Sequence, residues 1–190
     1  MPADSDSPAH LSDPVPAYAS RTIALVGLMG AGKSTVGRRL AEKLGRQFFD
    51  SDHEIEKAAG LSVADIFSMH GEADFRRGEQ KVLERLLGEA PHVLATGGGA
   101  YMNEETRALL REKAVTIWLN ADLETLWRRV QKKNTRPLLK RADAKSVLQD
   151  LFIAREPIYA QADLVVHSKE GPHGSTVNAI LKALKTWKPA

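Results

Sequence analysis

Short apolar runs alternate with amphipathic stretches along the chain from residue 21 onward. In the amphipathic stretches apolar residues recur at the spacing typical of helices, whereas the short apolar runs are typical of buried strands. Strands that alternate with helices form a parallel sheet covered by helices on both faces. The pattern therefore predicts an α/β fold with a parallel sheet. Its strands are expected at residues 22–27, 47–50, 92–96, 114–120 and 164–168.

The interval between the second and third predicted strands is filled by helical stretches at residues 53–60, 62–70 and 71–88. A basic stretch at 132–144, which Pro137 interrupts, is interpreted as a mobile excursion, and a long helix follows it to about Gln161. The remaining helices are predicted at residues 33–45, 103–113, 122–131 and 175–187.

Residues 1–20 are rich in Pro, Ser, Ala and Asp without periodicity, which predicts a disordered tail before a single domain at 21–190. No apolar run approaches the ~18 residues that a membrane span needs, and the first residues lack the pattern of a secretory signal. These features and the absence of cysteine favour a cytoplasmic location.

The formal net charge of +3 is compatible with binding nucleic acid or small anionic ligands. The basic residues are scattered through helical stretches, and the longest runs are pairs such as Lys132–Lys133. Because a scattered surplus of this size is typical of a solvated surface, nucleic acid is not an expected partner.

The motif G-x-x-x-x-G-K-[ST] occupies residues 27–34, between the first predicted strand and the first predicted helix. In this phosphate loop, backbone N–H groups and the helix N-terminus attract a phosphate, Lys33 can reach the β- and γ-phosphates, and Ser34 can ligate Mg²⁺. The alternative is a glycine turn packed against a helix. It is the weaker interpretation, because the motif rarely occurs by chance in a chain of this length and because this copy lies between a strand and a helix. The motif predicts a nucleoside triphosphate site but leaves the phosphoryl acceptor open.

Two sets of charged residues each allow a functional and a purely structural interpretation. One set follows the second predicted strand, and the other lies in the helical stretch at 71–88. Asp50 and Asp52 lie where the carboxyl ends of parallel strands form a ligand crevice, and they can serve a metal and a substrate hydroxyl or cap the next helix. Arg76 and Glu79 are spaced for an ion pair that fixes the guanidinium, although most such pairs are solvated and contribute little.

A second glycine-rich segment, TGGGA at residues 96–100, follows the third predicted strand. Glycine suits both strained turns and close approach of the backbone to a ligand. The segment is therefore either a tight strand-to-helix turn or the wall of a second ligand site.

The chain resembles the shikimate kinase family in an ordered set of segments within residues 23–159. The phosphate loop is shared by many families, but its combination with the other segments is much more specific. The resemblance implies ATP-dependent phosphorylation of the 3-hydroxyl of shikimate, giving shikimate 3-phosphate and ADP, in aromatic amino acid biosynthesis. The segments are GLMGAGKSTVGR, DSD, ADIF, GEADFRR, GGGA, TRPLL and REPIY.

The resemblance also implies roles for individual residues. Asp52 matches the carboxylate that holds substrate hydroxyls and serves as the base. Asp50 matches an aspartate that contacts Mg²⁺ through water. Arg129 matches an arginine that stacks on adenine. Phe67 matches an aromatic wall of the shikimate pocket, with a core position as the alternative. The implied catalytic residues are Lys33, Asp52 and Arg136, the last on the lid. The implied ATP-binding residues are Gly30, Ala31, Gly32, Lys33, Ser34, Thr35, Arg129, Arg136 and Pro172. The implied shikimate-binding residues are Asp52, Phe67, Arg76, Gly97, Gly98, Gly99 and Arg155, and the implied metal ligands are Ser34 and Asp50.

At the level of the fold, the resemblance implies a three-layer α/β/α P-loop NTPase fold with strand order 2-3-1-4-5. It places a helical shikimate-binding segment at about 52–88 and a mobile lid at about 131–145. Mg²⁺ is the implied cofactor, ATP and shikimate are the implied small-molecule partners, and the chain is expected to be a monomer.

Two other functions remain open on the residues alone. A gluconate kinase or nucleoside monophosphate kinase shares the architecture, and a pair of arginines also suits a sugar acid. The segments DSD, FRR and GGGA favour shikimate over these acceptors. A nucleotide switch or nucleic-acid-stimulated ATPase would need partner surfaces, and no long basic or aromatic-interleaved tract supports one.

Overall fold

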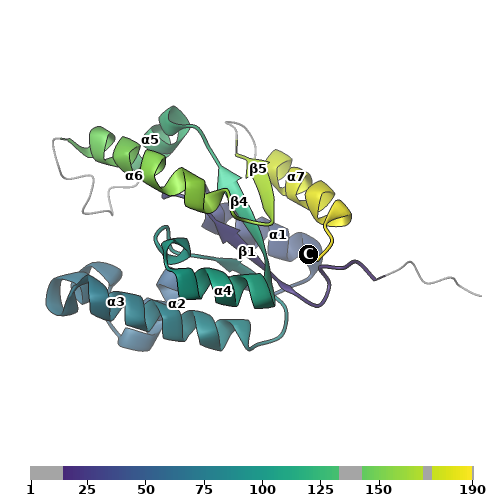
Figure 1. Cartoon of the computed structure of the whole chain (residues 1–190), viewed down its shortest axis with the longest axis horizontal. Helices are drawn as coiled ribbons and strands as arrows, with labels where there is room; N and C mark the ends of the chain where they lie inside the picture. The colour runs from purple at the N-terminus through teal and green to yellow at the C-terminus, as the bar shows by residue number, and fades with distance from the viewer. Residues whose placement is uncertain (1–14, 133–142, 169–172, 190) are drawn as a thin grey trace, which may run out of the picture.

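A computed structural model of the chain describes residues 15–132, 143–168 and 173–189 (Figure 1). Its centre is a parallel sheet with the order β2-β3-β1-β4-β5. This topology confirms the predicted fold class and the strand order that the resemblance implied. The strands are β1 (Thr22–Val26), β2 (Phe48–Asp50), β3 (Val93–Ala95), β4 (Ala114–Asn120) and β5 (Leu164–His167).

Helices cover both faces of the sheet, because its central strands are apolar on both sides. All residues of β1 are buried, and α1 and α7 pack against each other on one face while α3 and α4 pack together on the other (Figure 1). The helices are α1 (Lys33–Leu44), α2 (Ser51–Ala59), α3 (Val63–Leu87), α4 (Glu104–Lys113), α5 (Leu123–Gln131), α6 (Ala144–Tyr159) and α7 (His173–Thr186), with a 3₁₀ turn at Ala100–Met102.

The register of the sheet brings the ends of three strands together. Ala95 at the end of β3 pairs with Asp50 on one side and with Leu25 on the other. Because the strands are parallel, the segments that follow β1, β2 and β3 leave the sheet at the same edge. The phosphate loop, the aspartate pair and the triple glycine therefore start side by side.

The segment before β1 is more ordered than the sequence predicts, in the part that the structure describes. Residues 17–20 form a turn, and Arg46 donates hydrogen bonds to the carbonyl oxygens of Ala19 and Arg21, both at 2.8 Å. The Arg46 guanidinium also lies 5.8 Å from the ring centre of Tyr18. Order thus begins before residue 21, because these carbonyls satisfy a partly buried arginine.

A break inside α3 separates the second and third helical pieces that the sequence predicts. Gly71 has φ 79° and ψ 174°, a conformation that other residues rarely adopt. At this break the chain changes direction. The first part of α3, Val63–His70, precedes it, and the part that carries Arg76 follows it. Gly78, also in α3, has helical backbone and open space around its α-carbon.

We expect Gly71→Ala and Gly78→Ala to have opposite effects. Nothing lies within 4 Å of a Cβ at either position, so steric clashes do not contribute. The first replacement strains the backbone by about 1–3 kcal/mol, whereas the second removes the helix penalty of glycine, about 0.5–1 kcal/mol. Thermal unfolding should show a lower Tm for Gly71→Ala and an equal or higher Tm for Gly78→Ala. Equal destabilisation by both would show that Gly71 is not a required break.

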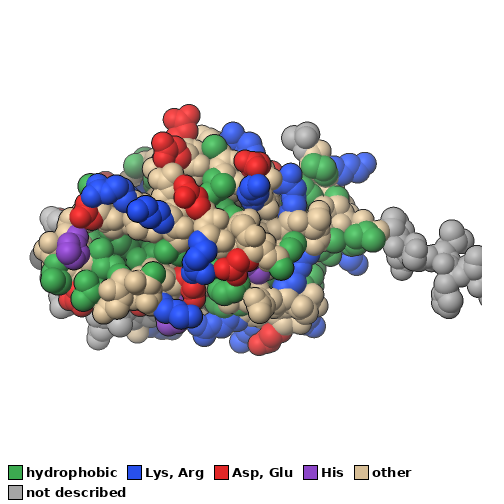
Figure 2. Space-filling model, turned by 90° about the horizontal axis from the view of Figure 1, so that it is seen from below, with side chains coloured by type: hydrophobic (Ala, Val, Ile, Leu, Met, Phe, Trp, Pro, Cys, Tyr) green, Lys and Arg blue, Asp and Glu red, His purple; other side chains and the backbone are tan. Residues whose placement is uncertain are grey.

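Basic and acidic side chains are mixed on the surface. Figure 2 shows Lys and Arg side chains interspersed with Asp and Glu side chains on the face seen there. In the described ranges, no helix combines the length and the apolarity required to cross a bilayer.

Candidate functional site: two glycine segments at one edge of the sheet

The glycines of the phosphate loop are required by backbone conformation. Gly27, Gly30 and Gly32 have φ angles of 137°, 83° and 94°, which L side chains rarely adopt. A Cβ on Gly27 would also lie 2.9 Å from the carbonyl oxygen of Leu119, and one on Gly30 would lie 2.8 Å from Cγ2 of Val130. The loop between β1 and α1 therefore has the tight, bare backbone that a phosphate cradle needs.

Lys33 begins α1 and turns its side chain back over the loop. Its ammonium group donates to the carbonyl oxygens of Gly27 at 2.6 Å and Leu28 at 3.1 Å, and the residue is only 9% exposed. Ala31 is buried in the same loop, whereas Thr35 lies exposed on the first turn of α1. The Lys33 ammonium group is thus held against the backbone of the phosphate loop.

Asp50 caps the next helix and also contacts Ser34, the other residue of the predicted metal site. As the N-cap of α2, it accepts a hydrogen bond from the Asp52 N–H through Oδ1 at 3.2 Å. Its other oxygen, Oδ2, accepts from the Ser34 hydroxyl at 2.5 Å. A carboxylate and a hydroxyl in contact beside a phosphate loop are hard oxygen donors of the kind that Mg²⁺ prefers.

Arg129, near the end of α5, lies against the outside of the phosphate loop. Its Nη1 donates to the carbonyl oxygen of Ala31 at 3.3 Å and to Ser168 Oγ at 3.0 Å. Ser168 follows β5, is 2% exposed, and itself donates to the Ala31 carbonyl oxygen at 3.2 Å. The end of the last strand is thereby fastened to the loop and to this arginine.

In the triple glycine, the first and third residues are required by space rather than by backbone conformation. None of Gly97, Gly98 and Gly99 has a positive φ. A Cβ on Gly97 would lie 2.6 Å from Asp52 Oδ1, and one on Gly99 would lie 2.9 Å from the central guanidinium carbon of Arg76. The segment is therefore not glycine-rich merely to turn, since its glycines leave room for charged groups that crowd against the backbone.

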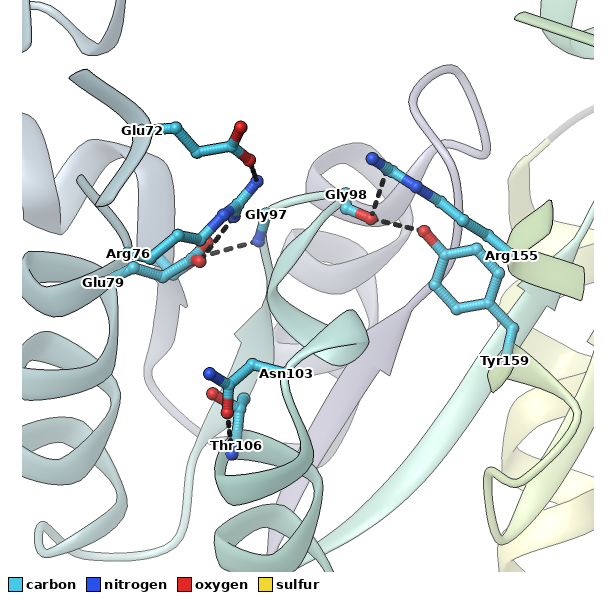
Figure 3. Close-up of polar contacts among 10 residues, drawn as sticks. Glu72, Arg76, Glu79, Gly97, Gly98, Asn103, Thr106, Arg155 and Tyr159 are labelled. Atoms are coloured by element: carbon cyan, nitrogen blue, oxygen red, sulfur yellow. Dashed lines mark hydrogen bonds and ion pairs between the residues drawn. The ribbon is translucent and has the colours of Figure 1, made fainter. Parts of the chain in front are cut away.

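The Arg76–Glu79 pair is not the solvated surface pair that its spacing usually indicates. Arg76 Nη1 donates to Glu79 Oε2 at 2.6 Å, and Glu79 is only 3% exposed (Figure 3). Glu72 contacts the other terminal nitrogen of Arg76 at 3.3 Å. Burial raises the pKa of Glu79, although its hydrogen bond and ion pair with Arg76 oppose the shift. The guanidinium is thus held in one orientation beside Gly99.

Glu79 has a second oxygen that points toward the glycine segment. Oε1 is buried, has no hydrogen-bond partner among the described residues, and would lie 2.9 Å from a Cβ on Gly97. The Asp52 carboxylate is close enough to raise the pKa of Glu79 further. The carboxylates of Asp52 and Glu79 therefore both face Gly97. Glu79 Oε1 can still accept a hydrogen bond from a ligand.

Arg155 approaches the glycine segment from the opposite side to Arg76, as Figure 3 shows. Its Nη1 donates to the Gly98 carbonyl oxygen at 3.1 Å, and the hydroxyl of Tyr159 donates to the same oxygen. Both residues come from the last turns of α6. The structure thus brings the two predicted carboxylate-binding arginines to one short segment.

Phe67 is not a core residue, so the alternative interpretation of this position is wrong. It is 36% exposed, and its ring centre lies 4.5 Å from that of Phe75. The Arg76 guanidinium lies 5.2 Å from the ring centre of Phe75. Phe67 thus packs on the ring that lies beside Arg76, and its role as a wall of the acceptor site stays a prediction.

The predicted lid arginine, Arg136, and the predicted adenine contact, Pro172, lie outside the described residues, as does most of the predicted lid segment.

The structure adds three polar residues to which the sequence analysis gave no role. Ser51 accepts from the Gly97 N–H at 2.8 Å, so this N–H already has a partner. Tyr159 and Ser168 are the others. Ser51 and Tyr159 lie within the recognised DSD and REPIY segments, but only the fold reveals their contacts.

A phosphate loop, with a second charged ligand site beside it at the edge of a 2-3-1-4-5 sheet, defines a P-loop kinase that acts on a small molecule. The family model described as shikimate kinase matches residues 29–185. The chain therefore belongs to the shikimate kinase family.

Individual relatives agree with this assignment. A shikimate kinase of Caulobacter vibrioides (strain NA1000 / CB15N) is 54% identical over 92% of this chain and 88% of its own length. A structure of shikimate kinase from Acinetobacter baumannii in complex with shikimate is 39% identical, with a TM-score of 0.84 over 88% of this chain and 94% of that one. A gluconokinase from Sinorhizobium meliloti 1021, 21% identical with a TM-score of 0.59 over 87% of this chain and 92% of its own, shares the fold alone.

Proposed function

We propose that this chain transfers the γ-phosphoryl group of ATP to the 3-hydroxyl of shikimate, giving shikimate 3-phosphate and ADP. The observation that carries the proposal is the placement of Arg76 and Arg155 on either side of a bare glycine segment, at the sheet edge that also holds the phosphate loop. Shikimate carries one carboxylate and three hydroxyls. A planar guanidinium can bond both oxygens of a carboxylate, which makes arginine better suited to this group than lysine.

In this proposal the acceptor lies against Gly97, Gly98 and Gly99, with Phe67 as an aromatic wall. Arg76 and Arg155 bind its carboxylate. Each charge-assisted hydrogen bond contributes about 1.5–3 kcal/mol, so the two arginines supply much of the affinity. Asp52 and the open oxygen of Glu79 accept hydrogen bonds from the hydroxyls, which is supported by their position around Gly97.

Phosphoryl transfer requires alignment and charge neutralisation more than covalent chemistry by the protein. The 3-hydroxyl oxygen forms a bond to the γ-phosphorus as the bond to the β–γ bridging oxygen breaks. Asp52 takes the hydroxyl proton, while Lys33 neutralises charge on the phosphates. Arg136 is proposed to add positive charge from the lid, whose closure would also exclude water as a competing acceptor.

The donor side of the proposal comprises the nucleotide and its metal. Gly30, Ala31, Gly32, Ser34 and Thr35 hold the phosphates together with Lys33, and Arg129 and Pro172 enclose the adenine. Mg²⁺ would be held by Ser34 directly and by Asp50 through water, which their 2.5 Å contact supports. When bound, Mg²⁺ supplies neutralising charge to the phosphate oxygens. The chain is proposed to act as a monomer.

A coupled assay of ADP production tests the proposal directly. The purified chain is given ATP and Mg²⁺ with shikimate, gluconate, AMP or no acceptor. We expect turnover with shikimate that exceeds every other condition. Turnover with gluconate and not with shikimate would refute the proposal and indicate a sugar-acid kinase, and turnover without an acceptor would indicate an ATPase.

Gly99→Ala tests whether the acceptor site needs the space that a glycine leaves beside Arg76. A Cβ on Gly99 lands on the Arg76 guanidinium. Because a side-chain end can move, Gly99→Ala should keep the fold but displace Arg76. We expect it to raise the shikimate KM about tenfold or more, the equivalent of one charge-assisted hydrogen bond.

Initial rates with varied shikimate and varied ATP check this prediction. Gly78→Ala is the control for an added methyl group, because Gly78 lies on α3 outside the glycine segment, with nothing within 4 Å of a Cβ. Its shikimate KM should stay within about threefold of the wild type, as expected for an unstrained surface change. The KM for ATP should be nearly constant in both variants. Equal increases of the shikimate KM in the two variants would mean that the space beside Arg76 is not what Gly99 provides.

A further inference from the structure

Two donors from α6 converge on one carbonyl oxygen of the glycine segment. Arg155 Nη1 and the Tyr159 hydroxyl both donate to the Gly98 oxygen (Figure 3). A carbonyl oxygen has two lone pairs, so both donors can be accommodated at once. Only one of them, Arg155, has a proposed task elsewhere, at the acceptor carboxylate.

We propose that Tyr159 is a positioning residue that keeps the Gly98 carbonyl bonded, and thereby frees Arg155 to turn toward the carboxylate of the acceptor. The inference rests on the proposed function, because it assigns Arg155 a carboxylate to bind. The Gly98 carbonyl is partly buried, and a carbonyl removed from water that loses its last hydrogen bond is costly. With Tyr159 in place, Arg155 can leave the Gly98 oxygen without incurring that cost.

The environment of Tyr159 fits a fixed donor rather than a mobile one. The residue is 2% exposed, and its ring is stacked with Trp118 and Tyr101, with ring centres 6.1 Å and 6.3 Å away. Two near-parallel neighbours prevent the ring from swinging. Burial also raises the pKa of the Tyr159 hydroxyl, so it stays protonated and remains a donor at neutral pH.

Arg155 differs from Tyr159 in the freedom of its side chain. It is half-buried, lies one helical turn before Tyr159, and makes its contact with Gly98 through a terminal nitrogen. Its guanidinium can therefore exchange the neutral carbonyl for a charged carboxylate, which is the stronger acceptor. The glycine segment keeps its position during the exchange because the hydroxyl of Tyr159 holds it.

The test is a double-mutant cycle with Tyr159→Phe and Arg155→Lys, measured as kcat/KM for shikimate at saturating ATP. Tyr159→Phe removes only the hydroxyl and leaves the stacked ring. We expect it to raise the shikimate KM about five- to tenfold, with kcat and the ATP KM within about twofold, as for the loss of one hydrogen bond to a partly buried oxygen. In the Arg155→Lys background the same replacement should have a clearly smaller effect, because the guanidinium that Tyr159 frees is gone.

Tyr101→Phe is the matched control, because it removes a hydroxyl from the other tyrosine of the same stack. That hydroxyl lies near Thr116 and is not one of the two donors to the Gly98 oxygen. The shikimate KM of Tyr101→Phe should equal that of the wild type. An effect of Tyr159→Phe that is equally large in the wild-type and Arg155→Lys backgrounds would overturn the inference, as would an unchanged shikimate KM. A wild-type chain that does not phosphorylate shikimate would instead refute the proposed function.

Discussion

Lys33→Ala should lower kcat by roughly 10³-fold while the chain stays folded. Removal of a single preorganised hydrogen-bond donor at a developing charge already costs about 10²–10³-fold in other enzymes. Lys33 supplies a full positive charge, and its ammonium group is buried against the carbonyl oxygens of Gly27 and Leu28. These neutral contacts can be exchanged for phosphate oxygens without moving the backbone of α1. The truncated side chain removes the ammonium group from this position.

Steady-state assays of the wild type, Lys33→Ala and Lys43→Ala check this expectation. Lys43 is an exposed lysine in the last turn of the same helix, so its replacement controls for loss of one positive charge. Lys43→Ala should retain the wild-type kcat. Thermal unfolding of each variant shows whether the fold is intact. A Lys33→Ala variant that is folded and turns over at the wild-type rate would exclude Lys33 from phosphoryl transfer.

The sheet and its edge could be predicted from the sequence because they follow from local patterns. Buried apolar runs define the strands, and residues that follow parallel strands must meet at the carboxyl edge. The 114–120 run, for example, coincides with β4. Helix breaks were also readable where glycine marked them, as at Gly71.

The purposes of the two glycine segments could not be separated in this way. In sequence, Gly30 and Gly98 are equally bare, yet only the first has a positive φ. The reason for the second segment lies in side chains from α2 and α3 that crowd against it, and their approach is a property of packing. The burial of Glu79 is of the same kind, since its spacing from Arg76 also fits an exposed helix face.

The contact between Tyr159 and Gly98 joins residues far apart in the chain, so no local sequence pattern predicts it. Helical periodicity does place Arg155 and Tyr159 on one face of α6. It does not say which element that face meets. Predicted roles at Arg136 and Pro172 depend on segments outside the described residues and stay predictions.

Asp52→Asn should lower kcat by about 10²-fold or more and leave the ATP KM within about threefold. The replacement has the same shape, but it removes the carboxylate that accepts the proton of the attacking hydroxyl, and general-base catalysis typically contributes about 10²–10⁴-fold. Asp52 lies in the first turn of α2, with Oδ1 directed at Gly97 and therefore at the acceptor side of the edge. Initial rates with varied ATP and varied shikimate measure both effects.

Asp50→Asn is the matched control, because it changes the same group two residues away, on the side that contacts Ser34. We expect this variant to need more Mg²⁺ for half-maximal rate, whereas Asp52→Asn should keep the wild-type Mg²⁺ dependence. The pH profile then distinguishes a base from a residue that only orients the hydroxyl. If Asp52 takes the proton, the acidic limb of the kcat/KM profile disappears in Asp52→Asn, since that limb reports a base in the free enzyme. Wild-type activity in Asp52→Asn, or an unaltered acidic limb, would assign the proton to another acceptor, and Glu79 is the carboxylate that faces the same glycine.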